Sequence, residues 1–497
     1  MALVPAGPSI ETRRADRRDA LAPGKDLMGS QRHVVVVGGG ISGLASAYFL
    51  RRAEPAERLA VTVVEATGRL GGKVRTAQIA GHAVDTGPES LLVHSAPLRD
   101  FVDQLGLATA VVEPAVNGAY VWSRGRLRRL PAGTIAGVAA RPVALLRSGL
   151  LSPVGLARAG ADLVLPRERD GQDVSVRALV GRRFGQQVLH RLADPLLGGV
   201  YAGSVDRLSA RSVVPELAAA ARDSRSAAWG LRRDTRVRAS GPSMVTLRGG
   251  LTRLVEALVA GLGDTQVLTG APVAALEPAA AGHLLRLADG TELDADAVVL
   301  AVPAFAAADL LAGVSPQAAA ALSGVPYSDV ATVTLAYPRE AIGRALDGTG
   351  FLVPSEEGLL LVGCTWLAAK WPHLAEGSQV LVRAMVGRHG DRRFADLDDA
   401  TLVARVHAEL VSIMALRAPP GETVVQRWPQ ALPQYTVGHE ARLAQLDAAL
   451  ERLPGLHVTG AAYRGVGLAG CVSQAEQVVK VILADLARAA DAEGSRP

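Results

Sequence analysis

The feature that most constrains the fold is a strand, glycine turn, helix and second strand within residues 33–76. A valine run at 34–37 is typical of a strand buried on both faces of a parallel sheet. It leads directly into a G-x-G-x-x-G turn at 38–43, and a helix-like segment and a second β-branched strand follow, ending in Glu65. In such a unit the glycines let the backbone approach a pyrophosphate at the helix N-terminus, and the acid binds ribose hydroxyls. The turn alone is weak evidence, but all the parts in this order predict a dinucleotide site.

The residues after Glu65 continue as E-A-T-G-R-L-G-G-K-V-R-T, which adds a second glycine pair and two cations. Gly72 and its neighbour offer another close backbone approach, and Arg69 with Lys73 can neutralise diphosphate charge. This extension resembles that of FAD-dependent oxidases in the amine oxidase superfamily, which implies FAD as the cofactor. No His or Cys lies in a motif similar to a flavinylation site, so we expect noncovalent binding. The predicted contacts from this region are Gly38, Gly39, Gly40, Ile41, Ser42, Gly43, Glu65, Ala66, Arg69, Gly72 and Lys73.

Length and composition exclude several other classes of protein. At about 150 residues per domain, 497 residues are enough for roughly two to four domains. The 53 basic and 48 acidic residues leave a modest charge of +5, and no basic run is interleaved with aromatics, which disfavours nucleic-acid binding. Cys364 and Cys471 lie far apart without metal-ligand spacing, so we expect no metal site and two reduced thiols in a cytoplasmic protein. No apolar stretch reaches the ~20 residues that a membrane span needs.

Two further segments differ in composition from the rest of the chain. Residues 1–31 are rich in Arg, Asp, Pro and Ala and lack the apolar core of a signal peptide, so we expect a disordered tail that the fold does not need. Residues 124–169 contain nine arginines against Asp162 and Glu168, among small apolar residues. Such a segment is more often a solvated helical face, but it can also be an interfacial helix on an anionic membrane. Both interpretations stay open, and the second predicts a peripheral contact with a membrane surface.

A second resemblance rests on segments that G-x-G-x-x-G proteins do not generally share. The sequence P-L-L-G-G-V-Y-A-G occupies residues 195–203, G-P-E-S lies at 87–90 and L-P-A-G-T at 130–134. With the cofactor turn, these segments resemble the flavin-dependent porphyrinogen oxidases of haem biosynthesis, over about residues 32–485. The resemblance implies a turn beside the flavin, a short strand at the adenine, and a glycine-rich turn that aims a helix N-terminus at the flavin pyrimidine. The cofactor contacts implied are Gly87, Pro88, Glu89, Ser90, Val273, Trp428, Val466, Gly467 and Leu468.

The same resemblance implies an α/β fold. It comprises a discontinuous, doubly wound Rossmann-like FAD domain, an antiparallel substrate-binding sheet domain and a helical insertion. We expect the FAD domain to be built from residues 32–95, 236–305 and 424–490. The helical insertion, with the potential membrane-surface segment, would cover residues 96–235, and the substrate domain residues 306–423.

The reaction implied is the removal of six electrons from coproporphyrinogen III to give coproporphyrin III, while three O2 become three H2O2. Protoporphyrinogen IX is the alternative substrate, with two propionates and two vinyls where coproporphyrinogen III has four propionates. A net basic chain without a spanning segment suits the more anionic, water-soluble substrate. Arg464 and Lys370 are candidate partners of its carboxylates, since a buried unpaired carboxylate costs several kcal/mol; a solvated surface charge is the alternative for each. The resemblance implies no catalytic base.

Two other functions stay open from the sequence. An FAD amine oxidase shares the cofactor motifs, but its substrates favour an aromatic cage and the chain has only seven Tyr, six Phe and five Trp. A flavin-binding sensor or assembly protein without turnover would need the same motifs. Oxygen uptake with a porphyrinogen separates the three hypotheses. Other enzymes of the haem pathway are candidate protein partners.

Overall fold

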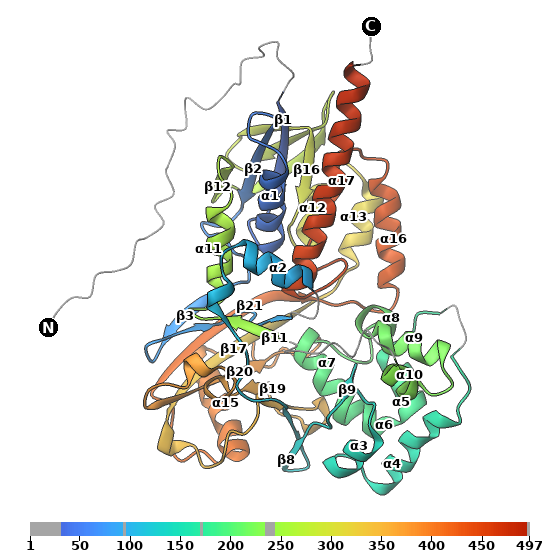
Figure 1. The fold of residues 1–497 in the computed structure, drawn as a ribbon, viewed down its shortest axis with the longest axis vertical. Coiled ribbons are helices and arrows are strands. Elements are labelled where there is room, and N and C mark those ends of the chain that lie inside the picture. Colours follow the sequence, from blue (N-terminus) through green and yellow to red (C-terminus); the bar gives the residue numbers. More distant parts are fainter. Residues whose placement is uncertain (1–30, 93–95, 169–171, 234–243, 495–497) are drawn as a thin grey trace, which may run out of the picture.

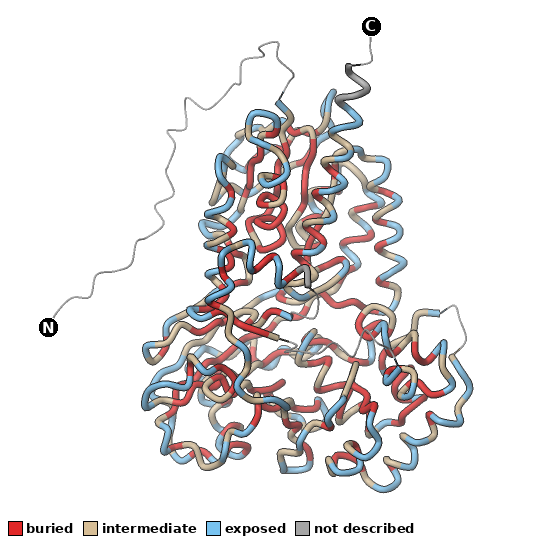
Figure 2. Tube along the Cα trace, in the orientation of Figure 1, coloured by how far each residue is buried: buried red, intermediate tan, exposed pale blue. Residues whose placement is uncertain are grey.

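The computed structural model describes residues 31–92, 96–168, 172–233 and 244–494. The tail expected at 1–31 lies, except for Gln31, outside these ranges. Figure 1 shows three parts: a nucleotide-binding sheet with flanking helices at the top, a second sheet below it, and a helical cluster beside the second sheet. Figure 2 shows that buried residues follow the strands and the inner faces of the helices.

The upper part is built on a five-stranded parallel sheet in the order β12-β2-β1-β16-β22. This order places strands from three separate stretches of sequence side by side, as expected for a discontinuous, doubly wound domain. The strands are β1 (Arg32–Val37), β2 (Leu59–Glu65), β12 (Gln266–Thr269), β16 (Ala297–Leu300) and β22 (Leu456–Val458). The helices around it are α1 (Ile41–Ala53), α11 (Thr252–Ala260), α12 (Ala304–Leu311), α13 (Pro316–Ser323), α16 (His439–Leu450) and α17 (Leu468–Gly494).

Alternate residues of β1 face two different hydrophobic cores. Val34 and Val36 pack with α1, α11 and α17, whereas Val35 and Val37 pack with α12, α13 and α16. Because successive side chains of a strand point to opposite faces, a strand covered on both sides has to be apolar throughout. The valine run in the sequence therefore predicted this strand correctly, and the doubly wound fold class is confirmed.

The second sheet has seven strands in the order β21-β17-β20-β19-β18-β7-β8, and only the pairing of β18 with β7 is parallel. One of its faces packs against α15 (Asp399–Met414). The strands are β7 (Tyr120–Ser123), β8 (Arg126–Arg129), β17 (Tyr327–Pro338), β18 (Gly350–Leu352), β19 (Leu361–Thr365), β20 (Gln379–Val386) and β21 (Glu422–Pro433).

Two of the domain boundaries predicted from the sequence do not match the extent of this sheet. Strands β7 and β8 lie within 96–235, which was expected to be helical, and β21 crosses the expected border between residues 423 and 424. The sequence of β8 is R-L-R-R, which has no apolar alternation; its register is set by pairing with β7 across a tight turn. These strands were not predicted from the sequence, because each is defined by hydrogen bonds to a partner strand and the sequence pattern does not show that partner.

The helical cluster is formed by residues 142–233 and has a core of its own. A π-helix at Leu189–Ala193 precedes α7, and Pro195 at the start of α7 supplies no backbone donor to the preceding turn. Its helices are α3 (Pro142–Ser148), α4 (Pro153–Gly160), α5 (Val176–Phe184), α6 (Gln186–Val188), α7 (Asp194–Tyr201), α8 (Ala210–Val213), α9 (Pro215–Asp223) and α10 (Ala227–Arg233).

Shorter elements connect the three parts. Helix α2 (Ala96–Gln104) agrees with the apolar periodicity of that segment. The remaining strands are β3 (Thr76–Ile79), β4 (His82–Asp85), β5 (Leu91–Leu92), β6 (Val111–Val112), β9 (Thr134–Ile135), β10 (Val138–Ala139), β11 (Met244–Leu247), β13 (Val273–Pro278), β14 (His283–Leu287) and β15 (Glu292–Ala295). Helix α14 (Leu367–Lys370) follows β19. No helix in the described ranges combines the length and the hydrophobicity needed to cross a membrane.

Candidate active site

The first glycine turn joins β1 to α1 and cannot carry side chains at two of its positions. A Cβ on Gly43 would lie 1.8 Å from the carbonyl oxygen of Gly38, and Gly38 itself has a φ of +110°. Helix α1 begins without a side-chain cap, although Ile41 and Ser42 in its first turn are buried. The first N–H groups of a helix need an acceptor, so a buried and uncapped helix start fits an anionic ligand.

The second glycine turn lies directly against the first. The N–H of Gly71 donates to the carbonyl of Gly39 at 2.8 Å, and a Cβ on Gly72 would be 3.1 Å from the Cα of Gly40. Gly71 and Gly72 both have positive φ, at +96° and +55°. A side chain at Gly72 would press on Gly40, and the positive φ at Gly71 and Gly72 is a conformation that favours glycine, which explains the glycine pair of the second turn.

Glu65 ends β2 and holds the first turn. Its Oε2 accepts the N–H of Gly39 at 2.7 Å, and its Oε1 accepts the N–H and the hydroxyl of Thr67 at 2.8 and 2.7 Å. A carboxylate has about four acceptor sites, so these three bonds leave room for a ribose hydroxyl. Ala66, the next residue, is exposed.

The two cations of the extended motif are used differently from one another. The guanidinium of Arg69 donates to the carbonyls of Leu70, Gly72 and Val74, so it braces the second glycine turn from within. The ammonium of Lys73 donates to the carbonyl of Ala431 at 2.5 Å, and burial lowers its pKa to about 8. Among the residues that the structure describes, no carboxylate forms an ion pair with either side chain.

Residues 85–89 form a loop, here called the Gly-Pro loop, that the second sheet holds from below. The indole N–H of Trp428 and the hydroxyl of Thr332 both donate to the carbonyl of Thr86, at 3.0 and 2.7 Å. A Cβ on Gly87 would be 2.0 Å from the carbonyl oxygen of Lys73, so the loop touches the chain just after the second glycine turn. Pro88 and Ser90 are half-buried.

Glu89 in this loop is buried and ion-paired with two cations. Its Oε1 lies 2.5 Å from the Nζ of Lys370, and its Oε2 lies 2.6 Å from Nη2 of Arg383. Burial alone would raise the pKa of Glu89, but Arg383 and Lys370 outweigh it and hold the pKa at about 2. Lys370 is 6% exposed, so it is not a solvated surface charge, and its ammonium is already paired with Glu89.

The last predicted turn precedes α17, which packs alongside α1 (Figure 1). The side chain of Ser42, at the start of α1, hydrogen-bonds the thiol of Cys471 in the first turn of α17. The two helix starts therefore face the same region, as expected for Val466, Gly467 and Leu468, of which Gly467 is exposed and the other two are half-buried.

The two remaining predicted residues lie at the edges of this region. Val273 begins β13, and the segment before it is tied to Glu65, because the N–H of Ala271 donates to the carbonyl of Glu65 at 3.0 Å. Arg464 is half-exposed and ion-paired with Asp447 of α16. It therefore lies on the surface with a partner of its own.

Arg383 and Thr332 were not predicted as site residues from the sequence. Arg383 occurs in β20, whose sequence Q-V-L-V-R-A-M-V is otherwise apolar, and Thr332 occurs in the apolar strand β17. An arginine within a buried strand needs a partner, and that was the signal available in the sequence. The partner, Glu89, could not be identified because 294 positions separate the two residues.

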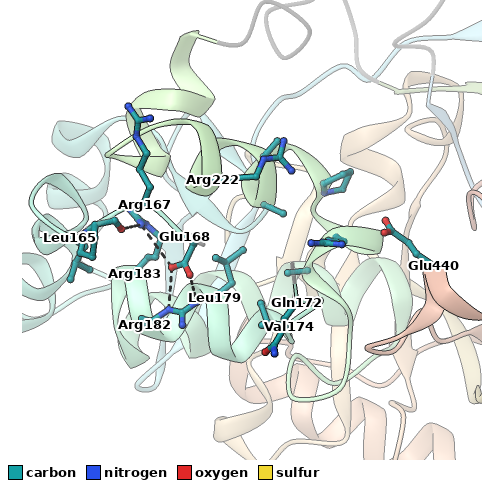
Figure 3. A pocket seen from close by; sticks show the side chains of 16 residues that line it. Leu165, Arg167, Glu168, Gln172, Val174, Leu179, Arg182, Arg183, Arg222 and Glu440 are labelled. Carbon is teal, nitrogen blue, oxygen red and sulfur yellow. Dashed lines mark hydrogen bonds and ion pairs between the residues drawn. The ribbon is translucent and has the colours of Figure 1, made fainter. Parts of the chain in front are cut away.

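A separate cavity of about 810 Å³ lies in the helical cluster (Figure 3). It is lined by five arginines and two glutamates, and Figure 3 shows Glu168 paired with Arg182 and Arg183 at its wall. The arginines are Arg167, Arg182, Arg183, Arg211 and Arg222. None of the predicted cofactor or substrate residues lines it.

These contacts fit an elongated dinucleotide better than any other ligand class. The Gly38–Gly43 turn, the second glycine turn, Glu65 and the Gly-Pro loop are joined in series by direct contacts. The two glycine turns allow a ligand to approach the backbone closely, which suits a pyrophosphate. The carboxylate of Glu65 beside them suits a ribose. No three His, Cys, Asp or Glu side chains gather as metal ligands in the described part of the chain.

The comparisons with known proteins agree with this geometry. Residues 41–483 match the flavin containing amine oxidoreductases as a family. The chain is 35% identical to coproporphyrinogen III oxidase of Bacillus subtilis over 90% of its own length and 97% of that protein, and 30% identical to that of Staphylococcus aureus, over 92% and 100%. Protoporphyrinogen oxidase of Bos taurus is 32% identical, over 91% and 98%.

A solved structure extends this likeness to the fold. The crystal structure titled "Putative protoporphyrinogen oxidase" from Exiguobacterium sp. 255-15 superposes with a TM-score of 0.81 at 29% identity, covering 92% of this chain and 99% of that one. A reduced UDP-galactopyranose mutase superposes with a TM-score of 0.70 at 15% identity, a likeness of fold alone. The match to the flavin containing amine oxidoreductases over residues 41–483 confirms the FAD cofactor expected from the sequence. The chain belongs to the flavin containing amine oxidoreductase family and, within it, to the FAD-dependent porphyrinogen oxidases.

Proposed function

We propose that the protein oxidises coproporphyrinogen III to coproporphyrin III, with three O2 reduced to three H2O2. The observation that carries the proposal is its end-to-end match to curated coproporphyrinogen III oxidases, at 30–35% identity over 97% or more of their length. The bovine protoporphyrinogen oxidase, at 32%, lies within the same range of identity, so protoporphyrinogen IX is the alternative substrate. The two kinds of relative, coproporphyrinogen III oxidases and a protoporphyrinogen oxidase, both support a porphyrinogen over an amine as the substrate.

The proposed FAD contacts follow the chain of touching segments from Glu65 to α17. The adenosine would lie near Glu65 and Val273, and the pyrophosphate would lie along the touching backbones of the two glycine turns, beside Gly40 and Gly72. The flavin would lie between the Gly-Pro loop and the start of α17. When bound there, FAD supplies the acceptor for each pair of electrons and the reaction with O2. The protein's own part is to orient the substrate and exclude water, so we propose no catalytic base.

The decisive experiment is a comparison of both porphyrinogens under matched conditions. Purified, FAD-loaded protein would be assayed by porphyrin fluorescence and O2 uptake, with a primary amine such as putrescine as a third substrate. A higher kcat/KM for coproporphyrinogen III supports the proposal, and a higher value for protoporphyrinogen IX replaces the substrate. Turnover of the amine alone, or of nothing, would overturn the porphyrinogen oxidase assignment for this chain.

We also propose that the helical cluster contacts an anionic membrane surface. Large apolar side chains stay exposed on α3, α4 and the following turn, among them Leu146 at 61% and Val154 at 77%. Arg141 and Arg147 are exposed on the same stretch as Leu146. Each basic side chain near an anionic leaflet adds about 1 kcal/mol, an attraction that salt screens.

Flotation with liposomes that contain anionic lipid tests this contact. We expect binding at low salt, weaker binding at high salt, and weaker binding by Leu146→Ser. Val481→Ser is the matched control, because Val481 is also exposed but lies on α17. No flotation at low salt would show that residues 124–169 are a solvated face.

A further inference from the structure

We propose that Glu89, Lys370 and Arg383 form a positioning cluster that fixes the Gly-Pro loop beside the flavin and sets the flavin's reduction potential. In this assignment Lys370 acts through Glu89 and does not bind a substrate carboxylate. The inference rests on the proposed location of FAD, and its test uses no porphyrinogen.

The cluster is buried and closely packed. The side chains of Glu89, Lys370 and Arg383 are 9%, 8% and 13% exposed, and both ion pairs are 2.5–2.6 Å long. The ammonium of Lys370 also lies 4.6 Å from the ring centroid of Trp371. Neutralisation of one member changes the net charge of this buried group by one unit, so the sign of its electrostatic effect is predictable.

The planar guanidinium of Arg383 binds three residues of the Gly-Pro loop. Its Nη1 donates to the carbonyls of Asp85 and Gly87 at 2.8 and 2.9 Å, while its Nη2 pairs with Glu89. Lysine has no comparable planar set of donors. Together with Thr332 and Trp428, the arginine anchors four of the five positions of this loop, all but Pro88, to the second sheet.

The loop in turn meets the cofactor region. Gly87 is packed so closely on the carbonyl of Lys73 that a single added Cβ would clash with it. Gly72, the residue before Lys73, contacts Gly40. Displacement of the loop would therefore be transmitted to the glycine turns. This makes the cluster a positioning element for the cofactor and not only a local ion pair.

The charges of the cluster do not cancel. Two cations share the one carboxylate of Glu89, and the other carboxyl of the loop, Asp85, is turned to the start of α11, where Thr76 and the N–H of Leu251 bind it. Reduced flavin carries negative charge, so a net cation near it favours reduction. Loss of the anion and loss of a cation should then shift the potential in opposite directions.

The test is anaerobic spectroelectrochemistry of FAD-loaded Glu89→Gln and Lys370→Met. At a fixed potential near the wild-type midpoint, we expect the ratio of reduced to oxidised flavin to rise at least threefold in Glu89→Gln and to fall at least threefold in Lys370→Met. Lys370→Arg, which keeps the charge, should stay near wild type. Lys480→Met removes an exposed cation of α17 whose pair with Glu476 lies on the surface, and it should change nothing.

The FAD dissociation constant and the thermal midpoint of each variant are measured alongside. Shifts of the same sign in both variants, or no shift while FAD stays bound, would overturn the electrostatic role. If Glu89→Gln does not fold, Lys370→Met is compared with Lys370→Arg, because only the first variant removes the charge. A lower ratio of reduced to oxidised flavin in Lys370→Met than in Lys370→Arg then supports the electrostatic role, and equal ratios overturn it. Porphyrinogen turnover is not an input, so a wrong substrate assignment would leave this result unchanged.

Discussion

The indole N–H of Trp428 donates to the carbonyl of Thr86 at 3.0 Å across 342 positions of sequence. This bond joins the seven-stranded sheet to the Gly-Pro loop next to the glycine turns. Trp428→Phe keeps an aromatic ring at this position but removes the donor, at about 1 kcal/mol for one hydrogen bond. We expect FAD to bind roughly fivefold more weakly, measured by titration of flavin fluorescence. An unchanged dissociation constant would show that the loop is held sufficiently by Thr332 and Arg383.

Gly40→Val should abolish FAD binding without unfolding the protein. A Cβ at Gly40 would be 4.0 Å from the Cα of Gly72, an ordinary contact, and φ at this position is −73°. The added side chain would therefore fit the protein and fill only the gap assigned to the pyrophosphate. Gly43→Ala is the contrast, since its Cβ would lie 1.8 Å from a backbone oxygen and should lower the thermal midpoint itself. Normal flavin content in purified Gly40→Val would contradict the assigned cofactor position.

FAD affinity should fall as pH rises through about 8. Burial lowers the pKa of Lys73 to about 8, so below this pH its ammonium is present to attract the diphosphate, and above it the amine is neutral. Binding of an anion raises the lysine's pKa again, so binding takes up a proton and weakens with pH. Lys73→Met should bind FAD more weakly at pH 7 and show a flatter dependence between pH 7 and 9. A wild-type affinity independent of pH would exclude this role.

Asp85 should make the apoprotein less stable as pH rises from about 4 to about 6. Burial raises the pKa of Asp85 to about 6, despite its bonds from Thr76 and Leu251. The folded state therefore binds a proton more tightly than the unfolded chain, and stability is lost as pH rises through that window, by roughly 3 kcal/mol for two pKa units. Asp85→Asn should flatten the change in thermal midpoint between pH 4.5 and 7. An equally steep change in the variant would assign it to other groups.

The buried pair Arg183–Asp162 should dominate the stability of the helical cluster. Nε of Arg183 lies 2.7 Å from Oδ1 of Asp162, and Oδ2 of the same carboxylate accepts a hydrogen bond from the hydroxyl of Ser226. Asp162→Ala leaves the arginine buried without its nearer carboxylate, with Glu168 at 3.9 Å as the other, at a cost of about 3–5 kcal/mol. Asp206→Ala, which breaks an exposed pair with Arg177, should cost less than about 1 kcal/mol. Similar losses of thermal midpoint in the two variants would contradict this ranking.

The sequence alone determined the nucleotide-binding unit, because every part of it is local. Burial on both faces requires an apolar strand such as Val34–Val37, and close backbone contact requires Gly38 and Gly43, so composition and spacing carry the information directly. The family resemblance extended this to FAD and to the doubly wound fold, both of which are confirmed.

Only the tertiary structure decided the partners of the charged residues and the membership of the second sheet. From the sequence, Lys370 is a candidate substrate cation with a solvated surface charge as the alternative, and in the structure it is paired with Glu89, 281 positions away. Strand β8 has no apolar alternation and exists because β7 supplies its hydrogen bonds. An ion pair and a strand pairing are properties of two segments at once, and the distance between them in space is set by the packing of the whole chain.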